Sequence, residues 1–340
     1  MKSLTCNEID TIAKHLHSYG NDKKLVNCEL VLNNKGRPWA ISGGQCRVYK
    51  VVQKDGTVKA LRFWNTILQE AEERCSAISS YLSTCPSSYF LSFEYVSNAF
   101  KYNGESFPVI LMDWSPAISL KKYIKNNLNS KSNLKHLQEE FVALITFLHD
   151  HKISHGDLHH DNIRVNSNGS LVLIDYDSLY VPPLKGYNDN CNGYSGYQHP
   201  IARTRNIKLS PKVDYFSELI IYLSIEALIE DSSLWDKYSI EENDQSFIFS
   251  INDFLNLKSS AIYKELSGKT ERLSILLKIL VYYLNLKKID DLLPFYEAPS
   301  ILGVSELTKI KNESIFCTNC GNKFTSYDDL YCIICGCKRV

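Results

Sequence analysis

An aspartate, a histidine and an asparagine lie close together in residues 155–162, which read His-Gly-Asp-Leu-His-His-Asp-Asn. Asp157 precedes Asn162 by five residues, and His159 lies between them. A carboxylate can orient a hydroxyl group and accept its proton, and an amide oxygen can bind magnesium. A second acid, Asp175, comes 13 residues after Asn162. Two acids and an amide at this spacing predict phosphoryl transfer.

The elements around this segment would bring its side chains together. Residues 133–151 carry apolar side chains at helical spacing, which predicts a helix with one face in a core. Two short strands are expected around Asn168-Gly169, a dipeptide typical of a two-residue hairpin turn. The second strand, over residues 171–174, runs directly into Asp175.

A glycine-bearing turn precedes this region. Residues 37–63 have a strand-like pattern, with Gly43 and Gly44 between short β-prone runs. Backbone amides of such a turn can lie close to phosphate groups, although two glycines are also typical of a simple hairpin. In the next strand Ala60 and Arg62 share a face, because side chains alternate along a strand. Arg62 could therefore contact phosphate oxygens, or it could be a solvated strand cation.

Residues 65–82 carry an apolar stripe at helical spacing, with Glu70, Glu72 and Glu73 beside it. One of these glutamates could pair with Arg62, and the sequence does not choose between them. Thr5-Cys6-Asn7-Glu8 has the spacing of a capping box, which predicts a short helix before residue 20 that packs without chemical function. Further strands are expected over residues 90–96 and 108–112, and helices over most of residues 217–293.

The C-terminus carries a separate cysteine signal. Cys317, Cys320, Cys332 and Cys335 form two Cys-x-x-Cys-Gly units with 11 residues between them. Four thiolates suit tetrahedral Zn²⁺, and iron is the weaker alternative. A unit of about 25 residues cannot build enough core alone, so metal would supply its folding energy, on the order of 10 kcal/mol. The pattern predicts a structural zinc ribbon with a docking or regulatory role and a possible protein partner.

Composition excludes several classes of function. In this chain of 340 residues, lysine plus arginine equals aspartate plus glutamate at 38 each, so no net charge attracts nucleic acid or anionic lipid. We expect no secretory signal and no membrane span, because the apolar runs are too short or interrupted by charge. Scattered cysteines without a secretory signal indicate reduced thiols and a cytoplasmic location.

The order and spacing of seven short motifs resemble those of protein kinases. The resemblance covers residues from about 29 to 300, and it is close to a bacterial kinase-like family with arginine in the third strand and a Gly-Tyr-Gln-His-Pro motif. It implies an α+β, bilobal fold with a small antiparallel β N-lobe and a helical C-lobe, to which the zinc ribbon is added. The motifs are Ser42-Gly43-Gly44-Gln45-Cys46-Arg47-Val48-Tyr49-Lys50, Ala60-Leu61-Arg62, Met112-Asp113-Trp114, residues 155–162, Asp175-Tyr176-Asp177, Gly196-Tyr197-Gln198-His199-Pro200 and Val213-Asp214-Tyr215-Phe216-Ser217.

The resemblance implies a role for each matched residue. Asp157 would be the catalytic base, and His159 would donate to the transferred phosphoryl group. Asn162 and Asp175 would bind Mg²⁺. The residues that would bind ATP are Gly43, Gly44, Val48, Ala60, Arg62, Asp113 and Trp114.

Two further residues would be structural. His155 would hold the catalytic segment, residues 155–162, from within, and Asp214 would brace that segment through its backbone amides. Gly156 stands where kinases have the arginine that gathers a phosphorylated activation segment. Phosphorylation of that segment is therefore not expected to switch this protein.

The chain departs from the kinase pattern elsewhere. Arg62 replaces the usual lysine, and a forked guanidinium is not equivalent to an ammonium, although arginine is the norm in the bacterial family. Cys46 and Arg47 take the place of further glycines. Asp177 replaces the glycine of Asp-Phe-Gly, where it could add a metal ligand or stiffen the segment. Ile201 replaces a glutamate, so the usual buried ion pair is absent.

Three functions fit these observations. The first is an ATP- and Mg²⁺-dependent kinase acting on protein Ser/Thr or on a small hydroxyl compound, and the retained Asp157, Asn162 and Asp175 favour it. The second is a nucleotide-binding pseudokinase scaffold, which Arg62 and the sparse glycine turn favour. The third is nucleotidyl transfer in the same site. The predicted organisation is a helical extension over residues 1–28, a kinase-like domain over 29–300 with its lobes divided near residue 114, a linker over 301–315 and the zinc ribbon over 316–340.

Overall fold

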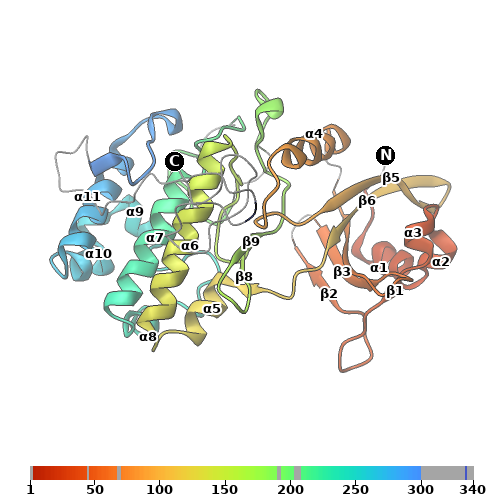
Figure 1. Cartoon of the computed structure of the whole chain (residues 1–340), viewed down its shortest axis with the longest axis horizontal. Coiled ribbons are helices and arrows are strands. Elements are labelled where there is room, and N and C mark those ends of the chain that lie inside the picture. Colours follow the sequence, from red (N-terminus) through yellow and green to blue (C-terminus); the bar gives the residue numbers. More distant parts are fainter. Residues whose placement is uncertain are drawn as a thin grey trace. The chain divides into compact units, whose positions relative to one another are not determined.

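Two units make up the part of the chain that the structure describes (Figure 1). The structure is a computed structural model, and it describes residues 3–43, 46–66, 70–189, 193–202, 208–299 and 334. The N-terminal unit consists of residues up to 84 together with 90–116. The C-terminal unit consists of residues 85–89 and those from 117 onward.

An antiparallel sheet organises the N-terminal unit. Its strands follow the order β1-β3-β4-β6-β5, and β2 also pairs with β3. The hairpin between β3 and β4 turns at Gly56, whose positive φ of 85° suits the predicted turn. The strands are β1 (Glu29–Leu30), β2 (Ala40–Ser42), β3 (Cys46–Val52), β4 (Val58–Trp64), β5 (Phe93–Tyr102) and β6 (Glu105–Asp113).

One face of this sheet packs on the N-terminal helices. Tyr49, Leu61 and Leu111 lie opposite one another in register and share a buried cluster with Ile9 and Ile12. The capping box predicted by the Thr5 spacing is present at the start of the first helix. The helices are α1 (Cys6–Lys14), α2 (Leu16–Tyr19) and α3 (Lys23–Val26).

The other face of the sheet carries the even-numbered residues of β3 and β4. Val48 lies opposite Arg62, and Ala60 lies opposite Met112. Helix α4 (Ala71–Thr84) packs near this face through Cys75, which clusters with Trp64 and Ile110. The helix predicted over residues 65–82 was wrong at its start, because β4 continues through Trp64 and Glu70 has a positive φ of 60° that a helix excludes.

Helices dominate the C-terminal unit. The long helices α6 (Lys131–Asp150) and α7 (Tyr215–Glu230) lie side by side, and α7 is buried from Tyr215 to Ile229 (Figure 1). The helix predicted over residues 133–151 is therefore present. The other α-helices of this unit are α5 (Leu120–Asn126), α8 (Leu234–Lys237), α9 (Ile251–Leu255), α10 (Ala261–Leu266) and α11 (Glu271–Asn285).

A small antiparallel sheet lies beside these helices. It consists of β7 (Ile118–Ser119), β8 (Ile163–Val165) and β9 (Leu171–Leu173). The hairpin between β8 and β9 turns at Gly169 with a φ of 88°, as the Asn-Gly dipeptide predicts. Short 3₁₀ helices complete the unit at Pro182–Leu184, Leu257–Ser259 and Ile289–Asp291.

An antiparallel sheet unit followed by a helical unit agrees with the predicted α+β class. The predicted linker and zinc ribbon lie outside the described residues, Ile334 excepted. Within the ranges that the structure describes, no helix combines the length and the apolar character needed to span a bilayer.

A polar cluster ties α1 to the strands around the glycine turn. The Asp10 carboxylate lies 2.7 Å from Arg47 Nε and accepts a hydrogen bond from the Tyr49 hydroxyl. Arg47 Nη1 in turn donates to Ser42 Oγ at 3.1 Å. Burial, reinforced by Asp10, raises the pKa of Tyr49. The N-terminal helix thus contacts β3 directly, and Arg47 links that contact to β2 on the other side of Gly43.

Replacing Asp10 with asparagine should lower the free energy of unfolding by about 1.5–3 kcal/mol, because Arg47 and Tyr49 lose a charged, partly buried acceptor. Glu94→Gln is the matched control, since its pair with Lys24 is about half exposed. That variant should change stability by no more than about 1 kcal/mol. Urea unfolding of both variants measures the difference, and equal losses would contradict a bracing role for Asp10.

Candidate active site

The segment over residues 155–162 connects α6 to β8 and is anchored from within by a histidine. His155 is fully buried, and its Nε2 lies 2.9 Å from the carbonyl oxygen of Ile174. Burial lowers the pKa of His155, so the ring is neutral and Nε2–H donates to that carbonyl. His155 thereby joins the segment to the chain directly after β9.

Asp157 and Asn162 are in direct contact. Asn162 Nδ2 donates to the backbone oxygen of Asp157 at 2.9 Å and to its Oδ2 at 3.3 Å. Both partners are acceptors, so the nitrogen of the amide must face Asp157 and the Oδ1 atom of Asn162 must point away from it. The contact holds the Asp157 carboxylate in one orientation and leaves an amide oxygen for another ligand.

Both ring nitrogens of His159 have polar contacts. Its Nδ1 accepts a hydrogen bond from the backbone N–H of Asp161 at 3.2 Å, and its Nε2 lies 3.0 Å from Asn162 Nδ2. Nε2 lies 3.4 Å from Asp157 Oδ2. The ring also stacks on Tyr194, with 4.1 Å between centroids. His159 is therefore fixed on both sides beside the candidate base.

Asp175 lies directly after a residue that is bonded to Asn162. The backbone N–H of Ile174 donates to the backbone oxygen of Asn162 at 3.0 Å. Asp175 itself has a φ of 68°, a left-handed conformation that few residues other than glycine adopt. The end of β9 thus places Asp175 one residue from a direct contact with the catalytic segment, in a backbone conformation common at functional sites.

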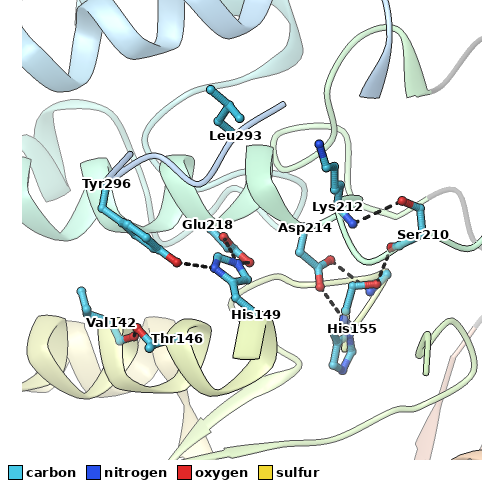
Figure 2. Close-up of polar contacts among 12 residues, drawn as sticks. Val142, Thr146, His149, His155, Ser210, Lys212, Asp214, Glu218, Leu293 and Tyr296 are labelled. Carbon is cyan, nitrogen blue, oxygen red and sulfur yellow. Dashed lines mark hydrogen bonds and ion pairs between the residues drawn. The ribbon is translucent and has the colours of Figure 1, made fainter. Parts of the chain in front are cut away.

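Asp214, at the start of α7, holds the catalytic segment through backbone amides (Figure 2). Its carboxylate accepts hydrogen bonds from the N–H groups of His155 and Gly156, the latter at 3.0 Å. Asp214 is 1% exposed. Burial, with the nearby charge of Glu218, raises the pKa of Asp214 to about 8, and the two amide hydrogen bonds oppose that rise.

Gly156 can be explained by the space around it. Its φ is 80°, and a Cβ atom there would lie 2.3 Å from the carbonyl oxygen of Ser178. A side chain is excluded by both the backbone conformation and the close approach. The absence of the kinase arginine at this position therefore has a local steric reason.

The activation segment contributes residues that sequence reasoning did not assign. A Cβ atom on Gly193 would lie 3.0 Å from Asp157 Oδ1, so this glycine passes close to the candidate base. Tyr194 covers His159, and burial raises the pKa of its hydroxyl. Tyr197 donates to His160 Nδ1 at 2.6 Å, and burial lowers the pKa of His160 to about 3. The spacing Gly-Tyr-Ser-Gly-Tyr was the available signal.

The histidine of the Gly-Tyr-Gln-His-Pro motif anchors the end of this segment. His199 Nδ1 accepts the N–H of Ile201 at 3.1 Å, and Nε2 lies 2.9 Å from the carbonyl oxygen of Tyr283 in α11. Burial lowers the pKa of His199, which agrees with a neutral ring that donates from Nε2. A neutral histidine thus fixes the end of this segment. The next residue but one, Ile201, stands where kinases have a glutamate.

The candidate nucleotide-binding residues lie in the N-terminal unit. Val48, Ala60 and Arg62 share one face of the sheet, and Arg62 is 8% exposed. The N–H of Gly43 donates to the Cys46 oxygen at 2.9 Å. Gly44 lies outside the described residues.

The predicted hinge residues and glutamates also belong to this unit. Asp113 forms an ion pair with Lys59, and the N–H of Trp114 donates to the Val58 oxygen at 3.3 Å. The Trp114 ring packs edge-on against Trp39 at 4.7 Å. Glu70, Glu72 and Glu73 are all exposed, and Glu70 lies 3.8 Å from Arg74. A pair between Arg62 and one of them stays a prediction.

The described residues contain no group of three or more His, Cys, Asp or Glu side chains that could hold a metal ion. Cys317, Cys320, Cys332 and Cys335 lie outside those residues. A magnesium site needs fewer protein ligands, because Mg²⁺ in nucleotide sites keeps water and phosphate oxygens.

Residues 42–283 match the family model of the protein kinase domain. A probable serine/threonine-protein kinase of Dictyostelium discoideum is 24% identical over 139 residues. That match covers 39% of this chain and only 29% of the length of the relative.

The close approach at Gly156 can be tested against a second glycine. Gly186 also has a positive φ, 94°, but nothing lies within 4 Å of a Cβ atom there. Gly186→Ala should lower the free energy of unfolding by about 1–2 kcal/mol through backbone strain alone. Gly156→Ala should lower it by a further 1–3 kcal/mol or so, because the Ser178 backbone must move. Thermal and urea unfolding give both values, and an equal loss in the two variants would refute the steric explanation.

Proposed function

The chain belongs to the protein kinase domain family, and from this we propose that it is an ATP- and Mg²⁺-dependent phosphotransferase with a hydroxyl group as acceptor. The contact between Asn162 and Asp157 carries the proposal. It orients a carboxylate as a base and frees an amide oxygen for a metal in the same segment. A scaffold that only binds nucleotide has no need of an oriented base.

Asp157 acts on the acceptor. Asn162 holds the side chain of Asp157 in place. The side chain is nevertheless 20% exposed and is thus accessible to an acceptor. The acceptor oxygen attacks the γ-phosphorus, the bond to the β,γ-bridging oxygen breaks, and the acceptor proton passes to Asp157 as ADP leaves. His159 lies 3.4 Å from the carboxylate and 3.0 Å from Asn162, so it would help to keep both side chains in place and, when protonated, could donate to the transferred group.

The donor set fits magnesium. Asn162 Oδ1 and the Asp175 carboxylate are hard oxygen ligands, and they would hold the ion while phosphate oxygens and water complete its shell. Bound Mg²⁺ would neutralise the phosphate charge. In the N-terminal unit, Arg62 and the Gly43-Gly44 turn would bind phosphate oxygens, and Val48, Ala60, Asp113 and Trp114 would line the base.

The acceptor class is proposed from a similar protein. The relative from Dictyostelium is named as a probable serine/threonine-protein kinase, and we propose protein Ser/Thr, or another alcohol, as the acceptor here. The side chains of Cys28, Cys75 and Cys85 are buried thiols, which agrees with a reducing, cytoplasmic setting. The proposed domain spans residues 29–300 after a helical extension, and residues 316–340 form the zinc ribbon that docks a partner.

Label transfer tests the activity. With γ-labelled ATP, Mg²⁺ and a generic protein or peptide acceptor, the wild type should transfer label, and Asp157→Asn should reduce the rate by about 10²–10⁴-fold. Asp236→Asn is the control, because this exposed aspartate of α8 lies outside the site. Transfer of α-label instead would indicate nucleotidyl transfer. Nucleotide binding without transfer of either label would leave a pseudokinase.

Metal analysis tests the tail. The full chain should purify with about one zinc per molecule, and Cys320→Ser should lose it because three thiolates no longer close a tetrahedral site. Cys6→Ser, a change at an exposed free cysteine of the first helix, should keep the metal. Iron in place of zinc, or a full zinc content in Cys320→Ser, would contradict the proposed ribbon.

A further inference from the structure

A buried histidine pairs with a carboxylate one helical turn from Asp214. His149, near the end of α6, lies 2.9 and 3.0 Å from the two carboxylate oxygens of Glu218 in α7. The Glu218 side chain is 1% exposed and that of His149 is 9% exposed. Figure 2 shows the pair beside Asp214 and the amides that Asp214 holds.

Asp214 and Glu218 form an unusual arrangement of like charge. They are four residues apart on one helix, a spacing that places side chains next to each other. Both are buried, so their repulsion is screened little by water. The N-terminus of α7 offsets part of this charge, and the only imidazole in contact with either carboxylate among the described residues is that of His149.

The segment after α11 reaches the same cluster. The Tyr296 hydroxyl lies 2.6 Å from His149 Nδ1, the nitrogen that does not face Glu218. Lys212 Nζ, close to Asp214 in sequence, donates to the carbonyl oxygens of Asp290 and Leu292. A protonated His149 can therefore donate from both nitrogens, to Glu218 and to Tyr296.

We propose that His149 is a positioning residue for phosphoryl transfer: its charge offsets Glu218, which eases the ionisation of Asp214 and so secures the grip of Asp214 on the catalytic segment. This rests on the proposed kinase function. An ionised Asp214 accepts the amides of His155 and Gly156 with both oxygens, whereas protonation converts one oxygen into a donor. Tyr296 strengthens the effect by accepting from His149, which couples the C-terminal segment to the catalytic one.

The charges around the cluster agree with this assignment. Burial lowers the pKa of His149, but Glu218 raises it by a larger amount, so the pKa lies above its ordinary value of 6.5. The pKa of Asp214 is about 8, so most of this carboxyl group is protonated below that pH. The other titratable groups that act on the cluster are Asp150 of α6, Tyr215 of α7, Tyr283 of α11, Glu297 and Tyr296 of the C-terminal segment, and Asp189 of the activation segment.

The sign of the pH dependence follows. The pKa of Asp214 in the folded protein lies above its ordinary value of 3.8. Protonation of Asp214 therefore contributes to the free energy of unfolding in full below pH 3.8, and this contribution is lost as the pH rises through about 8. Ionisation over the same range strengthens the hold on the catalytic segment. The turnover number should therefore rise with pH toward a plateau above about 8.

Four variants of the full chain separate positioning from packing. His149→Gln leaves Glu218 uncompensated and should move the rise in kcat to higher pH. If the midpoint of that rise moves up by about one pH unit, kcat at pH 7 should fall about tenfold and recover near pH 9. Glu218→Gln removes the repelling charge and should move the rise to lower pH. The double variant should return toward the wild-type profile, because the two changes offset each other. Tyr296→Phe should move the profile in the direction of His149→Gln, by less.

Amide exchange supplies a readout that does not need activity. The amides of His155 and Gly156 should exchange faster in His149→Gln than in the wild type at pH 7, and at the wild-type rate or slower in Glu218→Gln. Equal losses of kcat at every pH in all variants, with unchanged exchange, would overturn the proposal and leave a packing role. If the wild type transfers no phosphoryl group, the exchange pattern still decides the coupling, and only the kinase function fails.

Discussion

The described part of the candidate active site depends on one buried carboxylate and the two amides that it accepts. Asp214 is 1% exposed, so its ionised form is stabilised by the N–H groups of His155 and Gly156 and by the start of α7, with little help from water. That requirement fixes where the catalytic segment crosses the helix. Gly156 has a positive φ and no room for a side chain, because the backbone of Ser178 lies against it. The position of Asp157 follows from that turn.

Histidines complete the frame in two opposite ways, according to what they face. His155 and His199 face carbonyl groups, and burial lowers the pKa of each, so they are neutral links between segments. His160 faces the Tyr197 hydroxyl, and burial lowers its pKa to about 3 although the partly exposed Asp161 carboxylate lies 3.4 Å away. His149 faces a carboxylate, and the pKa rises despite burial. The neutral rings join elements without adding charge to the interior. The charged ring is found where two acids would otherwise repel each other.

Local patterns in the sequence were enough to predict a hairpin turn, a helix cap and the side chains that lie together in residues 155–162. Asn168-Gly169, the Thr5 capping box and the close spacing of Asp157 and Asn162 all involve contacts within a few residues. The pair between His149 and Glu218 spans 69 residues, and the stacking of Tyr194 on His159 depends on how a long segment folds back. No local spacing encodes such contacts. The start of α4 was mispredicted because the apolar stripe continues upstream of Glu70, whose positive φ of 60° precedes the helix and is not visible in the pattern.

The loss of the usual glutamate after Pro200 shows how the fold can replace an ion pair. Ile201 has no charge, but its N–H is taken by His199, whose other nitrogen donates to α11. The activation segment is thus anchored by two hydrogen bonds of a neutral ring, which needs no buried counter-charge. Among the described residues, a buried pair of His149 and Glu218 lies instead between α6 and α7. That pair is one helical turn from Asp214, which holds the amides of His155 and Gly156, whereas the end of the activation segment has a neutral anchor.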